Sequence, residues 1–248
     1  MKVFGIIPAR YGSTRLPAKV LADIGGKPMI QRVYERARQS PSLDRLVVAT
    51  DDDRILERVE DFGGEALKTS PTHPSGTDRV AEAGQILRAA EADVIVNIQA
   101  DQPLFEPGMI DEVVSPFRLD PDLKMGALVH PIRGPEELAN PSVVKVVRDR
   151  KGFALYFSRS PMPYVISGSL APKYYKHIGP YAYRMDFLLE FTQLERGDLE
   201  RSESLEQLRA LEHGYKIRVV ETKFDSQEVD TLEDLEKVRK QICGSKPD

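Results

Sequence analysis

Short hydrophobic runs alternate with amphipathic segments along the first half of the chain. Three runs are almost continuously apolar: residues 3–7, 45–50 and 93–99. Such runs are typical of parallel strands that are covered on both faces. Three other segments have the spacing of helices: residues 28–39, 52–62 and 76–90. This alternation predicts a doubly wound, mostly parallel α/β sheet with right-handed crossovers.

The second half of the chain has a less regular pattern. Three more apolar runs follow with few helical residues between them: 125–129, 143–147 and 153–157. They predict antiparallel or mixed strands, and residues 158–172, rich in Pro, Ser and Gly, predict a loop. Helical patterns return at residues 202–213 and 231–242. We expect one domain over residues 1–248, in which about 126–184 form a smaller mixed α+β lobe.

Composition narrows the class of partner. The 248 residues include 35 Lys and Arg against 39 Asp and Glu, a formal net charge of −4. This mildly acidic balance argues against broad binding to nucleic acid or anionic membranes, because both favour a basic surface. No apolar stretch approaches the ~18 residues of a membrane span, and no signal-peptide pattern is present. The single cysteine, Cys243, cannot form an intrachain disulfide. We therefore expect a cytoplasmic protein.

The loop after the first predicted strand is strongly basic. Arg10, Arg15 and Lys19 lie in it, and the first 22 residues contain no carboxylate. Open α/β sheets bind ligands at the carboxyl ends of their strands. Cationic side chains there can surround a polyphosphate, and Gly12 lets backbone N–H groups approach it. The alternative interpretation is a solvated basic loop. The P-loop and G-x-G-x-x-G patterns are absent, which disfavours a dinucleotide-dependent oxidoreductase.

Acidic residues follow other predicted strands. Asp101 comes directly after the third apolar run, and Asp230 precedes Thr231, a candidate helix N-cap. Two such acids beside a triphosphate suit Mg²⁺, which takes few protein oxygens and completes its octahedron with phosphate and water. Taken singly, each acid is also typical of a turn or a cap. Thr50 and Asp51 lie at another strand end, where acids also favour a helix N-terminus.

Two other catalytic classes lack support in the sequence. The histidines show no zinc-ligand spacing and no H-E-x-x-H pattern: His73, His130, His177 and His213. The G-x-S-x-G elbow of serine hydrolases is also missing. Zinc-dependent and serine-nucleophile chemistry are therefore disfavoured.

Residues 6–19, Ile-Ile-Pro-Ala-Arg-Tyr-Gly-Ser-Thr-Arg-Leu-Pro-Ala-Lys, resemble the signature loop of the sugar-acid cytidylyltransferases. The resemblance is closer to the 3-deoxy-manno-octulosonate (Kdo) cytidylyltransferases than to other members. Further segments resemble the same family, in the same order and across nearly the whole chain: residues 48–51, 75–79, 96–101, 144–147, 154–159, 176–179, 205–209 and 229–231. The chain is thus identified as similar to this family over its length.

The resemblance implies an activity and a set of site residues. CTP and Kdo would give CMP-Kdo and pyrophosphate for lipopolysaccharide assembly, with Mg²⁺, in a homodimer whose smaller lobe forms sugar-site and dimer elements. The residues implied for the nucleotide are Arg10, Ser13, Arg15, Lys19, Thr50, Asp51, Ser75, Gly76 and Arg79. Those implied for the sugar acid are Gln99, Arg159, His177, Tyr181, Glu206 and Gln207. Asp101 and Asp230 would hold the metal and, with Lys19, form the catalytic set.

The chain departs from the family pattern at three places, one of which is the segment after Pro163. Ala-Asp-Gln-Pro at residues 100–103 replaces the usual Gly-Asp-Glu-Pro, so Gln102 removes a charge beside the expected metal. Pro180 follows Gly179 where an aliphatic residue is usual. Three alternatives stay open: a cytidylyltransferase for a sialic acid or an amino-substituted Kdo, a nucleotide-binding module without catalysis, and a generic α/β interaction domain.

Overall fold

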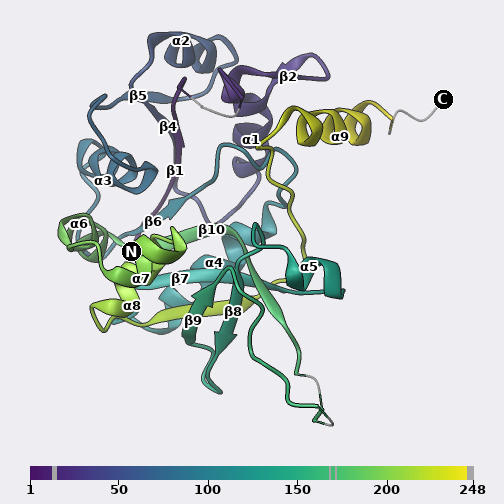
Figure 1. The fold of residues 1–248 in the computed structure, drawn as a ribbon. Helices are drawn as coiled ribbons and strands as arrows, with labels where there is room; N and C mark the ends of the chain where they lie inside the picture. The colour runs from purple at the N-terminus through teal and green to yellow at the C-terminus, as the bar shows by residue number, and fades with distance from the viewer. Residues whose placement is uncertain (13–15, 168, 171, 245–248) are drawn as a thin grey trace.

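The computed structural model describes residues 1–12, 16–167, 169, 170 and 172–244 (Figure 1). Within these residues a large sheet has the strand order β11-β7-β10-β6-β1-β4-β5, and β8 and β9 extend it from β10. Its strands are β1 (Val3–Ala9), β4 (Arg45–Thr50), β5 (Ala66–Lys68), β6 (Val94–Asn97), β7 (Met125–Pro131), β8 (Lys145–Arg148), β9 (Ala154–Ser158), β10 (Tyr175–Arg184) and β11 (Ile217–Glu221). A separate antiparallel hairpin consists of β2 (Asp23–Ile24) and β3 (Lys27–Pro28).

Helices connect most of these strands. They are η1 (a 3-10 helix, Lys19–Leu21), α1 (Met29–Ala37), α2 (Asp53–Asp61), α3 (Gly76–Ile86), α4 (Gly108–Leu119), α5 (Pro135–Ala139), α6 (Met185–Gln193), α7 (Asp198–Glu203), α8 (Gln207–Glu212) and α9 (Leu232–Cys243). α2 ends before Gly63, whose φ of 76° lies in the left-handed region that glycine adopts readily.

The pairing of the strands confirms the predicted fold class. β1 pairs in parallel with β4 and β6, β4 with β5, and β7 with β11. β10 runs antiparallel to its neighbours β6 and β7, and it carries the antiparallel β8–β9 hairpin. The part predicted as a smaller lobe, residues 126–184, thus contributes β7 and β10 to the main sheet.

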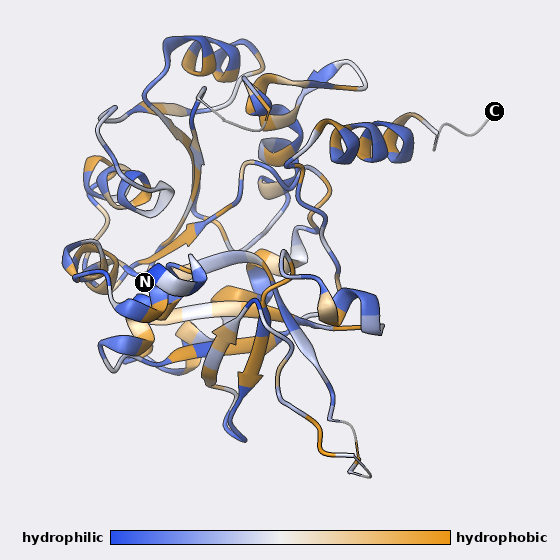
Figure 2. Cartoon of the chain, viewed as in Figure 1, coloured by the Kyte–Doolittle hydropathy of each residue, from blue (hydrophilic) through white to orange (hydrophobic). Residues whose placement is uncertain are grey.

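Hydrophobic side chains cover both faces of the sheet, as expected for a doubly wound fold. One core joins the sheet to α1, α2 and α4, and a second joins it to α3, α6 and α8. Figure 2 shows the hydropathy of these elements, with orange residues concentrated in the strands and blue residues on the outer sides of the helices. A third, smaller core packs α9 against the β2–β3 region.

One predicted helix is wrong. The segment 202–213 contains the end of α7 and then α8, separated by Ser204 in the left-handed conformation at φ 51°. The break places Glu206 at the N-cap of α8 and Gln207 at its first residue. The remaining predicted helices lie within one to four residues of the observed bounds at either end.

β10 is irregular where the chain departs from the family pattern. Its register with β7 shifts between Ile178 and Ala182, so Pro180 lies where the ladder is already interrupted. Gly179 has φ 75°, and a Cβ there would lie 2.6 Å from the Cε atom of Met109. The strand therefore accommodates a residue without an N–H at this bulge.

Candidate functional site

The carboxyl ends of β1 and β6 open onto a cavity of about 350 Å³. Eight of the predicted site residues line it: Arg10, Lys19, Ser75, Gly76, Arg79, Gln99, Asp101 and Asp230. Ser13 and Arg15 lie outside the described residues, so the structure places only part of the predicted basic loop. The N-terminus of α3 borders the cavity at Gly76, and a helix N-terminus favours an anion such as phosphate.

Lys19 is the cation at the centre of this cavity. Its Nζ donates to Asp101 Oδ2 at 2.8 Å and to Asp230 Oδ1 at 3.0 Å. Burial alone would lower the pKa of Lys19, but the two carboxylates outweigh that effect and raise it. Lys19 therefore stays charged, and its bond to Asp230 spans 211 positions of the sequence.

Two backbone features fix the acids beside Lys19. The Val229 N–H donates to the Asp101 carbonyl at 2.9 Å, which ties the segment before Asp230 to the end of β6. Thr231 and Asp234 form a reciprocal capping box at the start of α9, and Asp234 Oδ2 also accepts from the Asp230 N–H. The predicted N-cap at Thr231 is confirmed.

The arrangement of Asp101 and Asp230 fits a divalent ion. Both side chains are about one quarter exposed to the cavity, at 25% and 27%. Because an oxygen of each reaches the same Nζ atom, a cation near that position lies within reach of both. Among the described residues, no group of three or more His, Cys, Asp or Glu is arranged to hold a metal. Two protein oxygens completed by phosphate and water is the donor set that suits Mg²⁺.

The remaining predicted nucleotide residues support the wall of the cavity. Arg79 pairs with Asp51 at 2.8 Å and donates to Thr69 Oγ1 at 2.6 Å. Ser75 caps α3 by accepting from the Asp78 N–H. Thr50 is fully buried at the end of β4 and is not among the residues lining the cavity. The structure thus brings Arg79 and Ser75 to the cavity directly, and Asp51 through Arg79.

A second cavity of about 690 Å³ adjoins the first and shares Asp230 with it. Two of the predicted sugar residues, Arg159 and His177, line it. Its other walls come from residues 140–144 and 226–231, and Asp234 also contributes. Its size and its many polar groups fit a hydroxylated ligand better than an apolar one.

His177 presents an unsatisfied polar atom at this cavity. Its Nε2 is buried and has no hydrogen-bond partner among the residues that the structure describes, although part of the residue reaches the surface. The ring stacks on Tyr181, with centroids 4.4 Å apart. Burial lowers the pKa of His177 to about 4, so its imidazole is neutral at neutral pH. Such an orphaned nitrogen is a natural partner for a ligand hydroxyl.

Backbone carbonyls hold the guanidinium of Arg159 in place. Its Nε donates to the Glu203 carbonyl at 2.7 Å and its Nη1 to the Pro141 carbonyl at 3.0 Å. Its Nη2 lies 3.4 Å from the Ser204 carbonyl. A guanidinium has five N–H groups, so these bonds fix its plane and leave donors for a ligand.

Glu206 bonds to residues at the start of α3, beside the first cavity. It accepts from Ser75 Oγ at 3.1 Å and Thr77 Oγ1 at 2.5 Å, and Arg209 lies 3.5 Å away. Burial raises the pKa of Glu206, although these donors partly offset the shift. With Ser75 it lines a further cavity beside α7, and not the one that contains His177. Gln207, its neighbour, is buried.

Sequence reasoning missed several residues at these cavities. His73 lines the first cavity and pairs with Glu82 at 2.5 Å. Glu228 lines the second, opens to it, and accepts from Gln102 Nε2 at 3.2 Å. Desolvation, followed by repulsion from Asp101 and Asp230, raises the pKa of Glu228 to about 7. Gln102 lacks the charge that is usual in the family, but the carboxylate of Glu228 lies beside it. No local sequence pattern predicts this contact.

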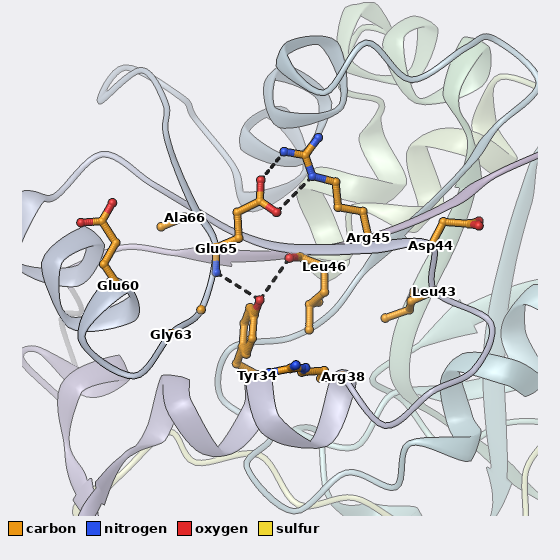
Figure 3. Close-up of a pocket in the computed structure, with 11 residues that line it drawn as sticks. Tyr34, Arg38, Leu43, Asp44, Arg45, Leu46, Glu60, Gly63, Glu65 and Ala66 are labelled. Carbon is orange, nitrogen blue, oxygen red and sulfur yellow. Dashed lines mark hydrogen bonds and ion pairs between the residues drawn. The ribbon is translucent and has the colours of Figure 1, made fainter.

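A cavity of about 540 Å³ lies at the opposite end of the sheet, beside the first residue of β4 (Figure 3). There Arg45 and Glu65 form a bidentate ion pair. The Tyr34 hydroxyl donates to the Leu46 carbonyl and accepts from the Glu65 N–H. These polar groups satisfy one another, and none of the predicted site residues lines this cavity.

None of the helices in the described part of the chain combines the length and the apolar character that crossing a membrane requires.

Comparison with known proteins gives consistent matches. The profile of the family described as "Cytidylyltransferase" matches residues 4–217. The 3-deoxy-manno-octulosonate cytidylyltransferase of Syntrophus aciditrophicus (strain SB) is 55% identical over 98% of both chains. That of Desulfosudis oleivorans is 50% identical over the whole of both chains.

Solved structures show the same likeness. A CMP:2-keto-3-deoxy-manno-octonic acid synthetase complexed with CTP superposes with a TM-score of 0.93 at 45% identity, covering 99% of this chain and 100% of that one. A 4-diphosphocytidyl-2C-methyl-D-erythritol synthase shares the fold, with a TM-score of 0.66 at 15% identity over 97% and 98% of the two chains.

Proposed function

This chain belongs to the cytidylyltransferase family, and we propose that it transfers CMP from CTP to the anomeric hydroxyl of Kdo, with release of pyrophosphate. Relatives that are 50–55% identical to this chain over 98–100% of their length are named 3-deoxy-manno-octulosonate cytidylyltransferase. The observation within the chain that supports the proposal most is the convergence of Lys19, Asp101 and Asp230 on one cavity beside the N-terminus of α3.

In this reaction the hydroxyl oxygen of the sugar attacks the α-phosphorus of CTP. A new P–O bond forms, the bond from the α-phosphorus to the bridging oxygen breaks, pyrophosphate leaves with that oxygen, and the hydroxyl proton passes to solvent. Both substrates are anions, so they repel each other. Catalysis therefore depends mainly on positioning and on neutralising charge.

The residues of the first cavity supply these effects for the nucleotide. Arg10 and Lys19 would offset the negative charge of the triphosphate and of the departing pyrophosphate. Asp101 and Asp230 would hold Mg²⁺, which would polarise the attacking hydroxyl and the phosphate oxygens. Lys19 keeps the two acids together by bonding to both.

The second cavity would hold the sugar acid next to the nucleotide. Asp230 is common to both cavities, so the two substrates meet there. Donors that Arg159 retains would bind the sugar carboxylate, and His177 Nε2 would meet a hydroxyl. Glu206 would link sugar binding to Ser75 at the nucleotide.

We extend the proposal to a homodimer and to a cytoplasmic location. Support for the dimer comes from the segment after β9, where Tyr164, Ile166 and Leu170 expose most of their surface. Exposed apolar side chains on one segment are typical of a protein interface. Sedimentation equilibrium at twice the chain mass of 27.9 kDa would support the dimer, and a monomer mass would contradict it.

Pyrophosphate release tests the activity. The four nucleoside triphosphates are each combined with Kdo, an amino-substituted Kdo and a sialic acid, with Mg²⁺ present. The proposal expects release with CTP and Kdo that exceeds release with every other pair. Preference for another sugar acid would reassign the substrate, and absence of release with all pairs would favour a binding module.

A further inference from the structure

Lys145 is a buried cation to which the proposed reaction gives no role. It is the first residue of β8, and its side chain is 0% exposed. Its Nζ donates to the Asn140 carbonyl at 2.8 Å and to the Val143 carbonyl at 2.7 Å. Among the described residues, no ion pair within 4.0 Å joins Lys145 to a carboxylate. Burial and then the charge of Arg159 lower its pKa.

The two carbonyls belong to a wall of the second cavity. Asn140, Ser142 and Val143 line that cavity. Arg159 Nη1 donates to the Pro141 carbonyl in the same segment, at 3.0 Å. Lys145 and Arg159 together thus bind three of the four carbonyls of residues 140–143, a segment that lies between α5 and β8.

The same lysine lies next to the other predicted sugar residues. In the β8–β10 ladder Lys145 pairs with Lys176, and the His177 N–H donates to the Val144 carbonyl at 2.8 Å. The segment 140–143, the backbone of His177 and the guanidinium of Arg159 are therefore joined by consecutive hydrogen bonds.

We propose that Lys145 is a positioning residue for the sugar acid: its ammonium fixes the wall formed by residues 140–143 against Arg159 and His177. The inference rests on the proposed function, because it concerns the sugar subsite of that reaction. Asn140, Ser142 and Val143 line this cavity, and the backbone of the segment is held through the carbonyls to which Lys145 donates.

The chemistry of the contact supports a role beyond packing. Burying an ammonium with no carboxylate within 4.0 Å carries a desolvation penalty, which the charge of Glu203 offsets only in part. An apolar side chain at the start of β8 would avoid this penalty. In return, one ammonium supplies several donors that converge on carbonyls from two residues, which no neutral aliphatic side chain provides.

Steady-state kinetics of Lys145→Met, Lys145→Arg and the control Lys151→Met test this inference. Lys151 is an exposed lysine in the turn after β8. In Lys145→Met we expect the KM for the sugar acid to rise at least tenfold while the KM for CTP stays within twofold. Lys145→Arg, which keeps the charge and the donors, should recover part of the loss, and Lys151→Met should behave as the wild type.

Hydrogen exchange gives a readout that does not depend on turnover. Loss of the ammonium should speed amide exchange at residues 140–144 and leave α3 unchanged. An unchanged sugar KM, or equal changes in both KM values, would overturn the role of Lys145 alone. If Lys145→Met fails to fold, the same comparison of the KM for the sugar acid with the KM for CTP is made in Lys145→Arg. Absence of wild-type turnover would instead overturn the proposed function, and this assignment with it.

Discussion

Removing the charge of Lys19 separates two effects that act in opposite directions. Its Nζ bonds to Asp101 and Asp230 in the structure, where the fit to a divalent ion is also best. An ion bound between those acids is therefore repelled by the ammonium beside it. The same ammonium attracts the phosphates of the nucleotide. Lys19→Met should accordingly strengthen binding of the ion and weaken catalysis.

The structure sets the size of both effects. The Lys19 side chain is 13% exposed and the acids about one quarter, so solvent screens the repulsion between the ammonium and the ion in part. We expect the affinity for Mg²⁺ to rise about tenfold, equivalent to about 1.4 kcal/mol. Loss of a charged contact to phosphate costs about 1.5–3 kcal/mol, which lowers kcat/KM by roughly 10- to 150-fold.

Two measurements check the two signs separately. Titration calorimetry of Mg²⁺ with the nucleotide-free protein gives the ion affinity, and pyrophosphate release gives kcat/KM. Lys27→Met is the matched control, since Lys27 is an exposed lysine that pairs with Glu35 away from the cavity. Circular dichroism checks that the fold of Lys19→Met is intact. Unchanged or weaker ion binding in that variant would refute the hypothesis that the ion binds beside the ammonium of Lys19.

Two further substitutions test other parts of the site. Asp101→Asn should lower turnover by on the order of a hundredfold, because one ligand of the ion loses its charge; near-normal turnover at limiting Mg²⁺ would contradict the metal assignment. Burial holds the pKa of His177 at about 4 in the folded protein, below its ordinary value of 6.5, so the stability it contributes is complete above pH 6.5 and falls as the pH decreases toward 4. Urea unfolding should show a loss of up to about 1.4 kcal/mol per pH unit in that window, which His177→Gln removes; equal slopes in both proteins would show that His177 is protonated normally.

The sequence predicts the parts of this molecule that depend on local pattern. The apolar runs at residues 3–7 and 45–50 become β1 and β4, because strands buried on both faces need continuous hydrophobic residues. Arg10 and Asp101 reach the same cavity because both follow parallel strands, whose carboxyl ends meet at one edge. Thr231 caps a helix as its residue type indicates.

Features set by tertiary contacts escape the sequence pattern. The break at Ser204 interrupts an otherwise helical periodicity, and nothing in the spacing of residues 202–213 marks a left-handed residue. Lys145 is charged in a run of valines, and it is buried because β8 pairs with both β9 and β10 at this residue. Glu228 approaches Asp101 because the Val229 N–H binds the Asp101 carbonyl, a contact between segments more than a hundred residues apart.

The bond between Lys19 and Asp230 has a consequence for the order in which the enzyme becomes competent during synthesis. A ribosome translates the basic loop and Asp101 long before it reaches Asp230 and the helix that anchors it. A nascent chain can therefore form most of its sheet while its reaction centre still lacks one carboxylate. Under the proposed role of Asp230, translation must pass this acid before CTP is consumed, so interrupted polypeptides would leave the nucleotide pool untouched.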